Sequence, residues 1–224
     1  MRKKSKALVS SRPSRSRNTA TKPAAKPLAR LPAAARLEIR RLKAQLAAAQ
    51  AMVDELRASA DTDFLLEILN RRGFVRELNR SIAYIKRYQA TGALIVLDVD
   101  RLKPVNDTFG HAAGDAVLKA VVAALSRHVR ASDLIGRLGG DEFALLLWNL
   151  SERDALAKAE ALEAAVDHLR IDFEGHTIAV GISAGVAILG PDSDAAAALK
   201  QADQAMYARK AERKSERGLA AIRR

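Results

Sequence analysis

The sequence predicts an α+β domain with a mainly antiparallel central sheet, preceded by a helix that forms a coiled coil. Long segments with helical periodicity alternate with short apolar runs of strand length. Two of these runs are separated by a Gly-Gly turn, which indicates an antiparallel hairpin. The sequence has no Gly-x-Gly-x-x-Gly or Walker loop that would favour a doubly wound parallel sheet.

Four segments of the domain are predicted to be helices because apolar residues recur at steps of three and four. In the second segment, Leu118, Val121 and Leu125 fall on one face. The third opens with Ser151 and Asp154, an acidic variant of the capping box. The predicted helices are residues 73–89, 113–129, 151–169 and 194–212.

The predicted strands are short apolar runs bounded by turn-forming residues. Residues 93–99 form an apolar run that ends in acidic residues, typical of a strand buried on both faces. The remaining predicted strands are the hairpin pair 134–135 and 143–147, followed by 171–173 and 177–189.

Before the domain, apolar residues repeat in alternating steps of three and four. They are Ile39, Leu42, Leu46, Ala49, Val53, Leu56 and Ala60. This pattern predicts a short parallel coiled coil over residues 36–62, through which the chain forms a homodimer. The alternative is one amphipathic helix lying on its own domain, but the narrow, charge-flanked stripe favours a partner helix.

The basic excess of the chain lies at its start. The formal net charge is +12, yet residues 1–36 hold 11 of the 38 Lys and Arg residues and none of the 26 acids. The remainder is therefore nearly neutral. Residues 1–35, rich in Ser, Pro and Ala, are predicted to be a disordered tail. Contact of this tail with anionic lipid or nucleic acid is an alternative that we favour less than a solvated leader.

The composition excludes several classes of protein. Without cysteine, the chain cannot form disulfides, thiolate metal sites or a cysteine nucleophile. Aromatic residues make up only 4%, which argues against a base-stacking platform for single-stranded nucleic acid. No apolar run approaches the roughly 18 residues that span a bilayer, and no apolar signal segment follows the basic start.

Two segments with paired acids mark a candidate site. Asp98 and Asp100 end the predicted buried strand, while Asp141 and Glu142 follow the two glycines of the hairpin turn. Glycine lets a bulky ligand approach the backbone. Carboxylates at neighbouring strand ends supply the hard oxygens that Mg²⁺ prefers. Each segment alone could be a solvated turn, but together they predict a metal site.

The residues around these acids resemble the two long motifs of GGDEF-domain diguanylate cyclases. Residues 137–143 read Arg-Leu-Gly-Gly-Asp-Glu-Phe, and residues 97–115 match the other motif nearly throughout. Because the resemblance runs from about residue 63 to 214, residues 63–224 are expected to form the catalytic domain. It implies a palm-like fold, as in nucleotidyl cyclases and polymerases, and a place in the bacterial cytoplasm.

The resemblance implies a Mg²⁺-dependent enzyme that joins two GTP molecules into cyclic di-GMP with loss of two pyrophosphates. Two Mg²⁺ ions, or Mn²⁺ in their place, would be held by Asp98, the Val99 carbonyl and Asp141. Asp141 or Glu142 would take the proton of the attacking hydroxyl, and Lys103 would balance charge on the phosphates. Each domain would bind one GTP, so activity would require a dimer.

Other residues of this chain match the family's ligand contacts. The substrate-binding set is Asn106, His111, Asp115, Gly139, Gly140, Lys210 and Lys214. For His111 and Asp115 the alternative is a helix-start cap that complements the helix dipole. Arg130 and Asp133 match the Arg-x-x-Asp site at which the family's product inhibits the enzyme.

The chain departs from the family pattern in two places. At the domain entrance Leu66 and Glu67 replace Thr-Gly, so we expect the preceding helix to run on more rigidly. Near the C-terminal end the pattern Tyr-x-Ala-Lys-x-x-Gly-Arg appears as residues 207–214, with Arg213 and Lys214 at its last two positions. Loss of a bidentate arginine at the last position would weaken GTP binding without abolishing the chemistry.

An active diguanylate cyclase is therefore the leading interpretation. The alternative is a catalytically silent cyclic di-GMP receptor or signalling scaffold, which is weakened because no metal or signature position is substituted. A third interpretation is a nucleic-acid adaptor acting through the basic tail, whose DNA binding would fall steeply with salt.

Overall fold

The structure is a computed structural model that describes residues 32–222, without the side chains of residues 51, 54–60 and 217–222. Most of the predicted basic tail therefore lies outside the described residues. The chain divides into two units, Met1–Ala51 and Met52–Arg224. No helix in the described part is long and apolar enough to cross a membrane.

Helix α1 (Ala33–Asp61) contains the heptad segment. Leu42 and Leu46 on the predicted seam are 54% and 59% exposed. Pairing of this seam with a second copy remains a prediction.

Our expectation that the helix runs on through the domain entrance is wrong. Helix α1 ends at Asp61, and the carboxylate of Asp63 accepts hydrogen bonds of 3.0 Å from the amides of both Leu65 and Leu66. Glu67 then adopts a left-handed backbone with φ 56°, at the position where the family pattern has Gly. A local turn, made by a side chain that competes for backbone amides, stops the helix.

The end of α1 is tied to helix α2 (Arg71–Tyr88) by a buried acid. Asp61 pairs with Arg76 and, at 3.0 Å, with Arg72. Burial raises the pKa of Asp61, but the hydrogen bonds from Arg76 and Arg72 outweigh it and hold that pKa below its ordinary value.

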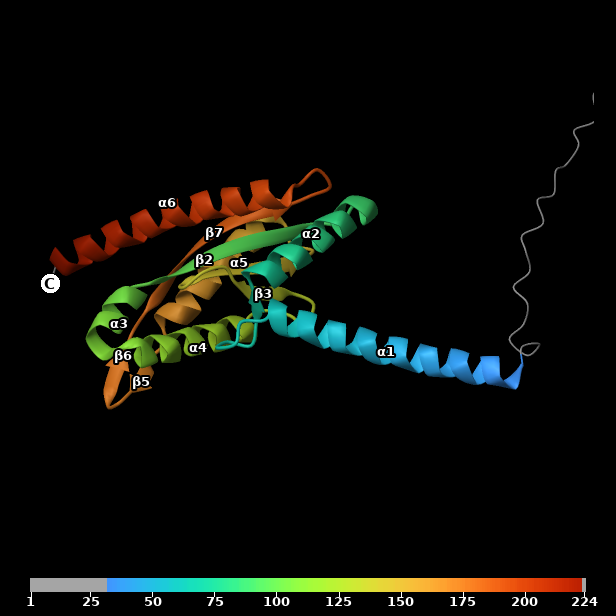
Figure 1. Cartoon of the computed structure of the whole chain (residues 1–224). Coiled ribbons are helices and arrows are strands. Elements are labelled where there is room, and N and C mark those ends of the chain that lie inside the picture. Colours follow the sequence, from blue (N-terminus) through green and yellow to red (C-terminus); the bar gives the residue numbers. More distant parts are fainter. Residues whose placement is uncertain (1–31, 223–224) are drawn as a thin grey trace, which may run out of the picture. The chain divides into compact units, whose positions relative to one another are not determined.

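The predicted α+β class with a mainly antiparallel sheet is confirmed (Figure 1). Five strands lie in the order β1-β3-β4-β2-β7, and only the β1–β3 pair is parallel. Their bounds are β1 (Leu69–Asn70), β2 (Gly92–Asp100), β3 (Leu134–Arg137), β4 (Glu142–Trp148) and β7 (Gly181–Leu189). Strand β2, which pairs with β4 on one side and β7 on the other, is buried along its whole length, as its apolar run predicts.

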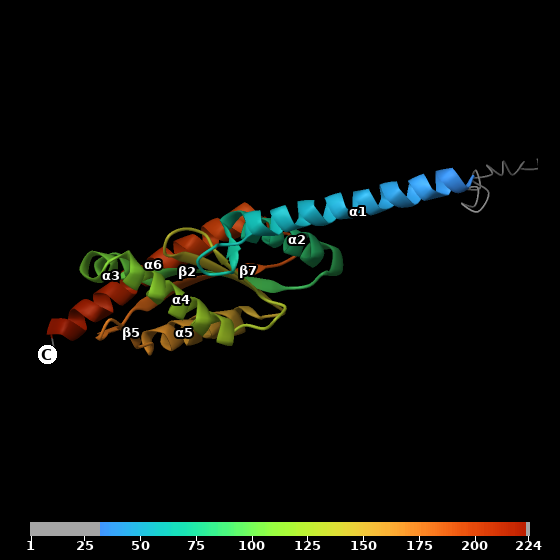
Figure 2. The same ribbon diagram turned by 60° about the horizontal axis from the view of Figure 1, so that its bottom comes forward.

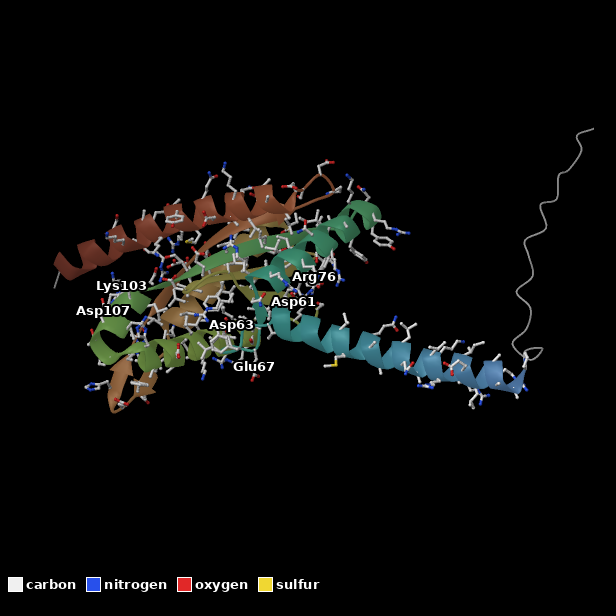
Figure 3. All side chains as sticks on the ribbon, viewed as in Figure 1. Asp61, Asp63, Glu67, Arg76, Lys103 and Asp107 are labelled. Atoms are coloured by element: carbon white, nitrogen blue, oxygen red, sulfur yellow. The ribbon has the colours of Figure 1, made fainter. Side chains whose placement is uncertain are left out.

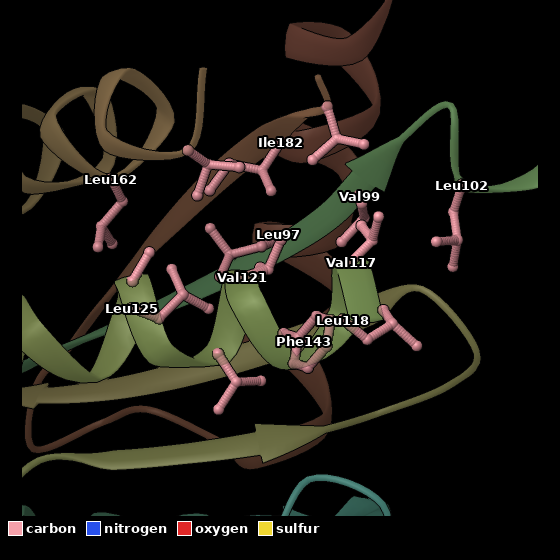
Figure 4. Close-up of a cluster of buried hydrophobic side chains, with 14 of the residues drawn as sticks. Leu97, Val99, Leu102, Val117, Leu118, Val121, Leu125, Phe143, Leu162 and Ile182 are labelled. Atoms are coloured by element: carbon pink, nitrogen blue, oxygen red, sulfur yellow. The ribbon is translucent and has the colours of Figure 1, made fainter. Parts of the chain in front are cut away.

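Helices cover both faces of the sheet (Figure 2). Successive side chains of a strand point to opposite faces, and both faces of this sheet carry apolar side chains that pack against helices. Leu97 and Val99 of β2 pack with helices α4 (His111–Arg127) and α5 (Glu152–Asp167), in the core drawn in Figure 4. Leu94 and Val96 face the other way and pack with α2 and α6 (Ala195–Ile222).

Three features of the fold differ from the prediction or were absent from it. Strand β1 and the short helix α3 (Leu102–Phe109) were not predicted. The predicted strand 177–189 is two strands, because β6 (His176–Ile178) pairs with β5 (Ile171–Phe173) in a separate ribbon while β7 joins the main sheet. Short elements have too few residues to show a period.

Gly185 allows α6 to pack against β7. A Cβ at this position would overlap the backbone of Ala202 and Met206 in α6. We expect Gly185→Ala to lower the free energy of unfolding by ~1–3 kcal/mol, the usual cost of overpacking. Urea unfolding measures it. Gly190→Ala is the matched control, since nothing lies within 4 Å of its Cβ position; equal stability of the two variants would contradict this account.

Candidate functional site

The candidate site lies where the end of β2 meets the hairpin turn between β3 and β4. Asp98 is opposite Glu142 in the antiparallel register of β2 and β4. The ladder is extended by a hydrogen bond of 3.0 Å from the amide of Val99 to the carbonyl of Asp141. Asp98 and Asp141 are 43 positions apart in the sequence. Strand pairing thus brings together the two acidic segments to which they belong.

Two arginine side chains hold the glycine turn by donating hydrogen bonds to its backbone carbonyls. The guanidinium of Arg137 donates to the carbonyls of Gly139 (3.1 Å) and Gly140 (2.7 Å), and it pairs with Asp63 at 3.0 Å. Arg71 donates to the carbonyl of Leu138 at 3.2 Å. The segment just after α1, where Figure 3 labels Asp63, therefore holds the turn in place. Sequence reasoning assigned no such role to Asp63 or Arg137, because nothing in either segment alone indicates the contact.

The turn leaves room for a ligand at Gly140. A Cβ built on Gly140 would meet nothing within 4 Å, so the backbone there faces open space. At Gly139 a Cβ would come within 3.1 Å of the Glu142 carboxylate. An accessible backbone beside two acids is the arrangement that a bulky anionic ligand with bound cations requires.

Asp98 is a buried carboxylate that pairs with a cation from α6. Its Oδ1 lies 2.6 Å from Nζ of Lys210. Burial raises the pKa of Asp98, and the neighbouring Asp141 and Asp100 add to this, while Lys210 only partly offsets it. Burial lowers the pKa of Lys210, but the contact with Asp98 outweighs it and the net shift is upward. The site therefore concentrates negative charge and favours bound cations.

These residues fit a divalent cation as an open site. In the described part of the chain, no group of three or more acidic, His or Cys residues could hold a metal by itself. Mg²⁺ commonly binds through one or two carboxylates together with substrate phosphates and water. Asp98, Asp141 and the Val99 carbonyl offer a donor set of this kind, with open space at Gly140 for the phosphates.

The helix after β2 carries two of the predicted ligand contacts. Lys103 and Asn106 lie on α3, where Lys103 is exposed (Figure 3). The side-chain oxygen of Asn106 is buried and has no hydrogen-bond partner among the described residues. Gly114 leaves space for it, because a Cβ there would overlap that oxygen. This oxygen is therefore packed between α3 and α4.

His111 and Asp115 lie in the first turns of α4, and both are exposed. The residue that caps this helix is Gly110, and no side chain makes a capping hydrogen bond. The alternative that either residue is a side-chain cap thus gains no support from the geometry.

Arg130 and Asp133 lie in the loop before β3, away from the acidic edge. The Asp133 carboxylate accepts from the amides of Arg130 (2.8 Å) and Trp148 (3.3 Å). Since Glu142 and Trp148 end the same strand, this loop and the acidic edge are about 20 Å apart at ~3.3 Å per residue. Both residues line a cavity of about 290 Å³ with Trp148 and Lys158.

Arg213 and Lys214, the two residues that depart from the family pattern near the C-terminal end, differ in their burial. Lys214 is exposed, whereas Arg213 is buried and pairs with Asp167 and Glu163. Sequence reasoning did not identify Glu163, because an acid in the middle of an amphipathic helix carries no signal of its own.

The burial of Asp98 has a consequence for stability. A folded-state pKa above the ordinary value means that the ionised form is disfavoured, so this cost is present at neutral pH and is relieved as pH falls. We expect Asp98→Asn to melt, without metal at pH 7, no lower than the parent, and to lose the rise in melting temperature that Mn²⁺ gives the parent. Differential scanning fluorimetry measures both.

Glu160→Gln, an exposed position on α5, is the control and should respond to Mn²⁺ like the parent. An unchanged Mn²⁺ response in Asp98→Asn would remove Asp98 from the metal site.

Known proteins are similar to this chain in sequence and architecture. Residues 60–216 match the family model described as diguanylate cyclase, GGDEF domain. Diguanylate cyclase DosC of Escherichia coli K12 is 36% identical over 146 residues, 65% of this chain and 32% of that protein. Diguanylate cyclase TpbB of Pseudomonas aeruginosa PAO1 is 37% identical over 166 residues, 73% of this chain and 38% of that protein. This chain thus spans well under half of either relative.

Solved structures of GGDEF domains and diguanylate cyclases also resemble this chain. The coiled coil and GGDEF domain of DgcB from Caulobacter crescentus, in complex with c-di-GMP, superposes with a TM-score of 0.70 at 27% identity, covering 79% of this chain and 94% of that one. Diguanylate cyclase SiaD of Pseudomonas aeruginosa, in complex with its activator SiaC, gives a TM-score of 0.66 at 31% identity, covering 78% and 70%. With the motifs at one edge of the expected sheet and a family match over residues 60–216, this chain belongs to the GGDEF-domain diguanylate cyclase family.

Proposed function

We propose that this chain condenses two GTP molecules into cyclic di-GMP and releases two pyrophosphates. The observation that carries the proposal is the pairing of the β2 end with the hairpin turn, which sets Asp98 beside Asp141 next to the open backbone of Gly140. The family membership and the names of the relatives support the same reaction.

The residues divide the work of an in-line displacement. Asp98, Asp141 and the Val99 carbonyl would hold Mg²⁺ or Mn²⁺, which when bound supplies charge neutralisation at the phosphates. Asp141 or Glu142 would accept the proton of the attacking 3′-hydroxyl. Lys103 and Lys210 would bind the triphosphate, and Lys210 would leave Asp98 to do so, exchanging a carboxylate for a phosphate oxygen.

Recognition of guanine is assigned to α3 and the start of α4. Asn106, on α3, would contribute a polar contact to the base. The Asp115 carboxylate would accept from guanine N1–H and the exocyclic amine, an edge that adenine does not present. His111, four residues earlier on α4, would close the same pocket. Lys214, exposed on α6, would be a weaker phosphate contact.

The reaction needs two domains, since each domain supplies one GTP. We assign dimer formation to the heptad segment of α1, whose Leu42 and Leu46 are exposed. Two chains paired there would hold two acidic edges at a high effective concentration.

Purified protein with GTP and Mg²⁺ should produce cyclic di-GMP, detected by chromatography and mass spectrometry. Asp141→Ala should lower the rate by at least about 100-fold, because it removes both a cation ligand and a candidate base. The rate per chain should also fall on dilution through the dimer dissociation range. Binding of cyclic di-GMP without any synthesis would instead identify the silent receptor.

We further propose that the product binds at Arg130 and Asp133 and inhibits synthesis. Arg130 offers a bidentate contact to phosphate or guanine, and the adjoining cavity of about 290 Å³ also contains Lys158. Arg130→Ala should raise the concentration of added cyclic di-GMP that halves the rate by about tenfold or more. The single Trp148 lines the cavity, so its fluorescence reports binding directly. Unchanged inhibition in this variant would place the inhibitory site elsewhere.

A further inference from the structure

Two arginines of α6 reach around the edge of the sheet to an acid on the opposite layer. Strand β7 is one of the two edge strands of the five-stranded sheet, with α6 packed on one face of the sheet and α5 on the other. Arg209 of α6 lies 2.9 Å from the Glu163 carboxylate of α5, and Arg213 lies 3.1 Å from it. Glu163 therefore links the two helical layers across the edge of β7.

Glu163 is a fixed acceptor. It is only 4% exposed, and its Oε1 accepts a hydrogen bond of 3.0 Å from the amide of Ala184 in β7. A buried carboxylate persists only when it is paired and hydrogen-bonded, so both arginines and this amide are needed to satisfy it. The same contacts cover an edge-strand amide that would otherwise be open to pairing.

Arg213 is the more deeply held of the two arginines. It is 7% exposed, and its Nη2 lies 2.6 Å and 2.8 Å from the two carboxylate oxygens of Asp167. Its Nε lies 3.5 Å from Asp100, which also accepts a 2.9 Å hydrogen bond from Ser183. The Arg213 side chain thus joins α6 to acids of α5 and β2, and Ser183 of β7 holds one of those acids.

The contacts set α6 in register with the catalytic strand. Asp98 and Asp100 lie two residues apart on β2 and so point to the same face. Lys210 pairs with Asp98 and Arg213 with Asp100, so two cations of one helical turn stand above two anions of one strand. The Lys210 side chain is 41% exposed and the Arg213 side chain 8%, so the inner pair is fixed while the outer cation can turn toward a ligand.

We propose that Arg209 and Arg213 are positioning residues, which hold α6 through Glu163 so that Lys210 is presented to the triphosphate of a nucleotide at the Asp98–Asp141 edge. Both stand where the family pattern noted in the sequence has Ala and Gly, so this device is a feature of this chain. The inference rests on the proposed function for the identity of the ligand.

A double-mutant cycle on nucleotide binding tests the proposal. The full chain with Mg²⁺ is titrated by calorimetry with a GTP analogue whose α–β bridge is a methylene group, so that no turnover occurs. Arg213→Ala should weaken binding about tenfold in the parent but less than about twofold in a Lys210→Ala background, because Arg213 acts through Lys210. Equal effects in the two backgrounds, or no effect in a folded Arg213→Ala protein, would overturn the proposal.

Arg209→Ala provides a second test that does not depend on the stability of the Arg213 variant. Its side chain is 32% exposed, and its loss leaves Arg213 in place on Glu163, so we expect a smaller effect with the same dependence on Lys210. Arg170→Ala is the matched control, because Arg170 donates to the backbone carbonyls of Asp167 and Leu169, and it should not change binding.

The two proposals fail separately. Coupled binding effects in a protein that makes no cyclic di-GMP would refute the catalytic function and leave the positioning role. Synthesis of cyclic di-GMP with additive binding effects would refute the positioning role alone.

Discussion

The antiparallel register between β2 and β4 is the constraint on which the site depends. It sets Asp98 opposite Glu142 and continues through the bond from the Val99 amide to the Asp141 carbonyl. A slip of one residue would move Asp98 to the face covered by α4 and α5, and Leu97 to the face covered by α6. The apolar packing of Leu97 and Val99 against α4 and α5 therefore fixes the geometry of the candidate site as well as the fold. Stability and function share one determinant here.

The charged residues near the paired ends of β2 and β4 form two groups, an outer tier that is partly exposed and an inner tier that is buried. The outer tier is the acidic edge with Lys210, where burial raises the pKa of Asp98 and negative charge is held ready for cations. The inner tier is the set of buried pairs in which Glu163, Asp167 and Asp100 surround Arg213. Pairs that are shielded from water keep their geometry, while half-exposed ones can exchange partners. The buried pairs around Arg213 thus hold α6 in place, while Lys210 on the same helix stays exposed enough to change its partner.

The sequence predicted the long elements well, because each has enough residues to show its period. Strand β2 and the four long helices of the domain follow from apolar spacing alone. The short helix α3 did not, since its eight residues include a Pro and are too few to show a period. At the domain entrance the error had another origin. Losing a Gly suggested a continuous helix, but the Asp63 side chain imposed the turn and Glu67 accepted a left-handed backbone.

By itself, the sequence determined the fold class, the two acidic motifs and the family to which they point, because these reside in local composition and spacing. Tertiary structure decided which of the acids face one another, which are buried and which cation each one meets. Glu163 and Arg213 are 50 positions apart and neither segment hints at the other. Their pairing arises only when two helices pack on opposite faces of one edge strand, and distance in space, unlike periodicity, is not written in a single segment.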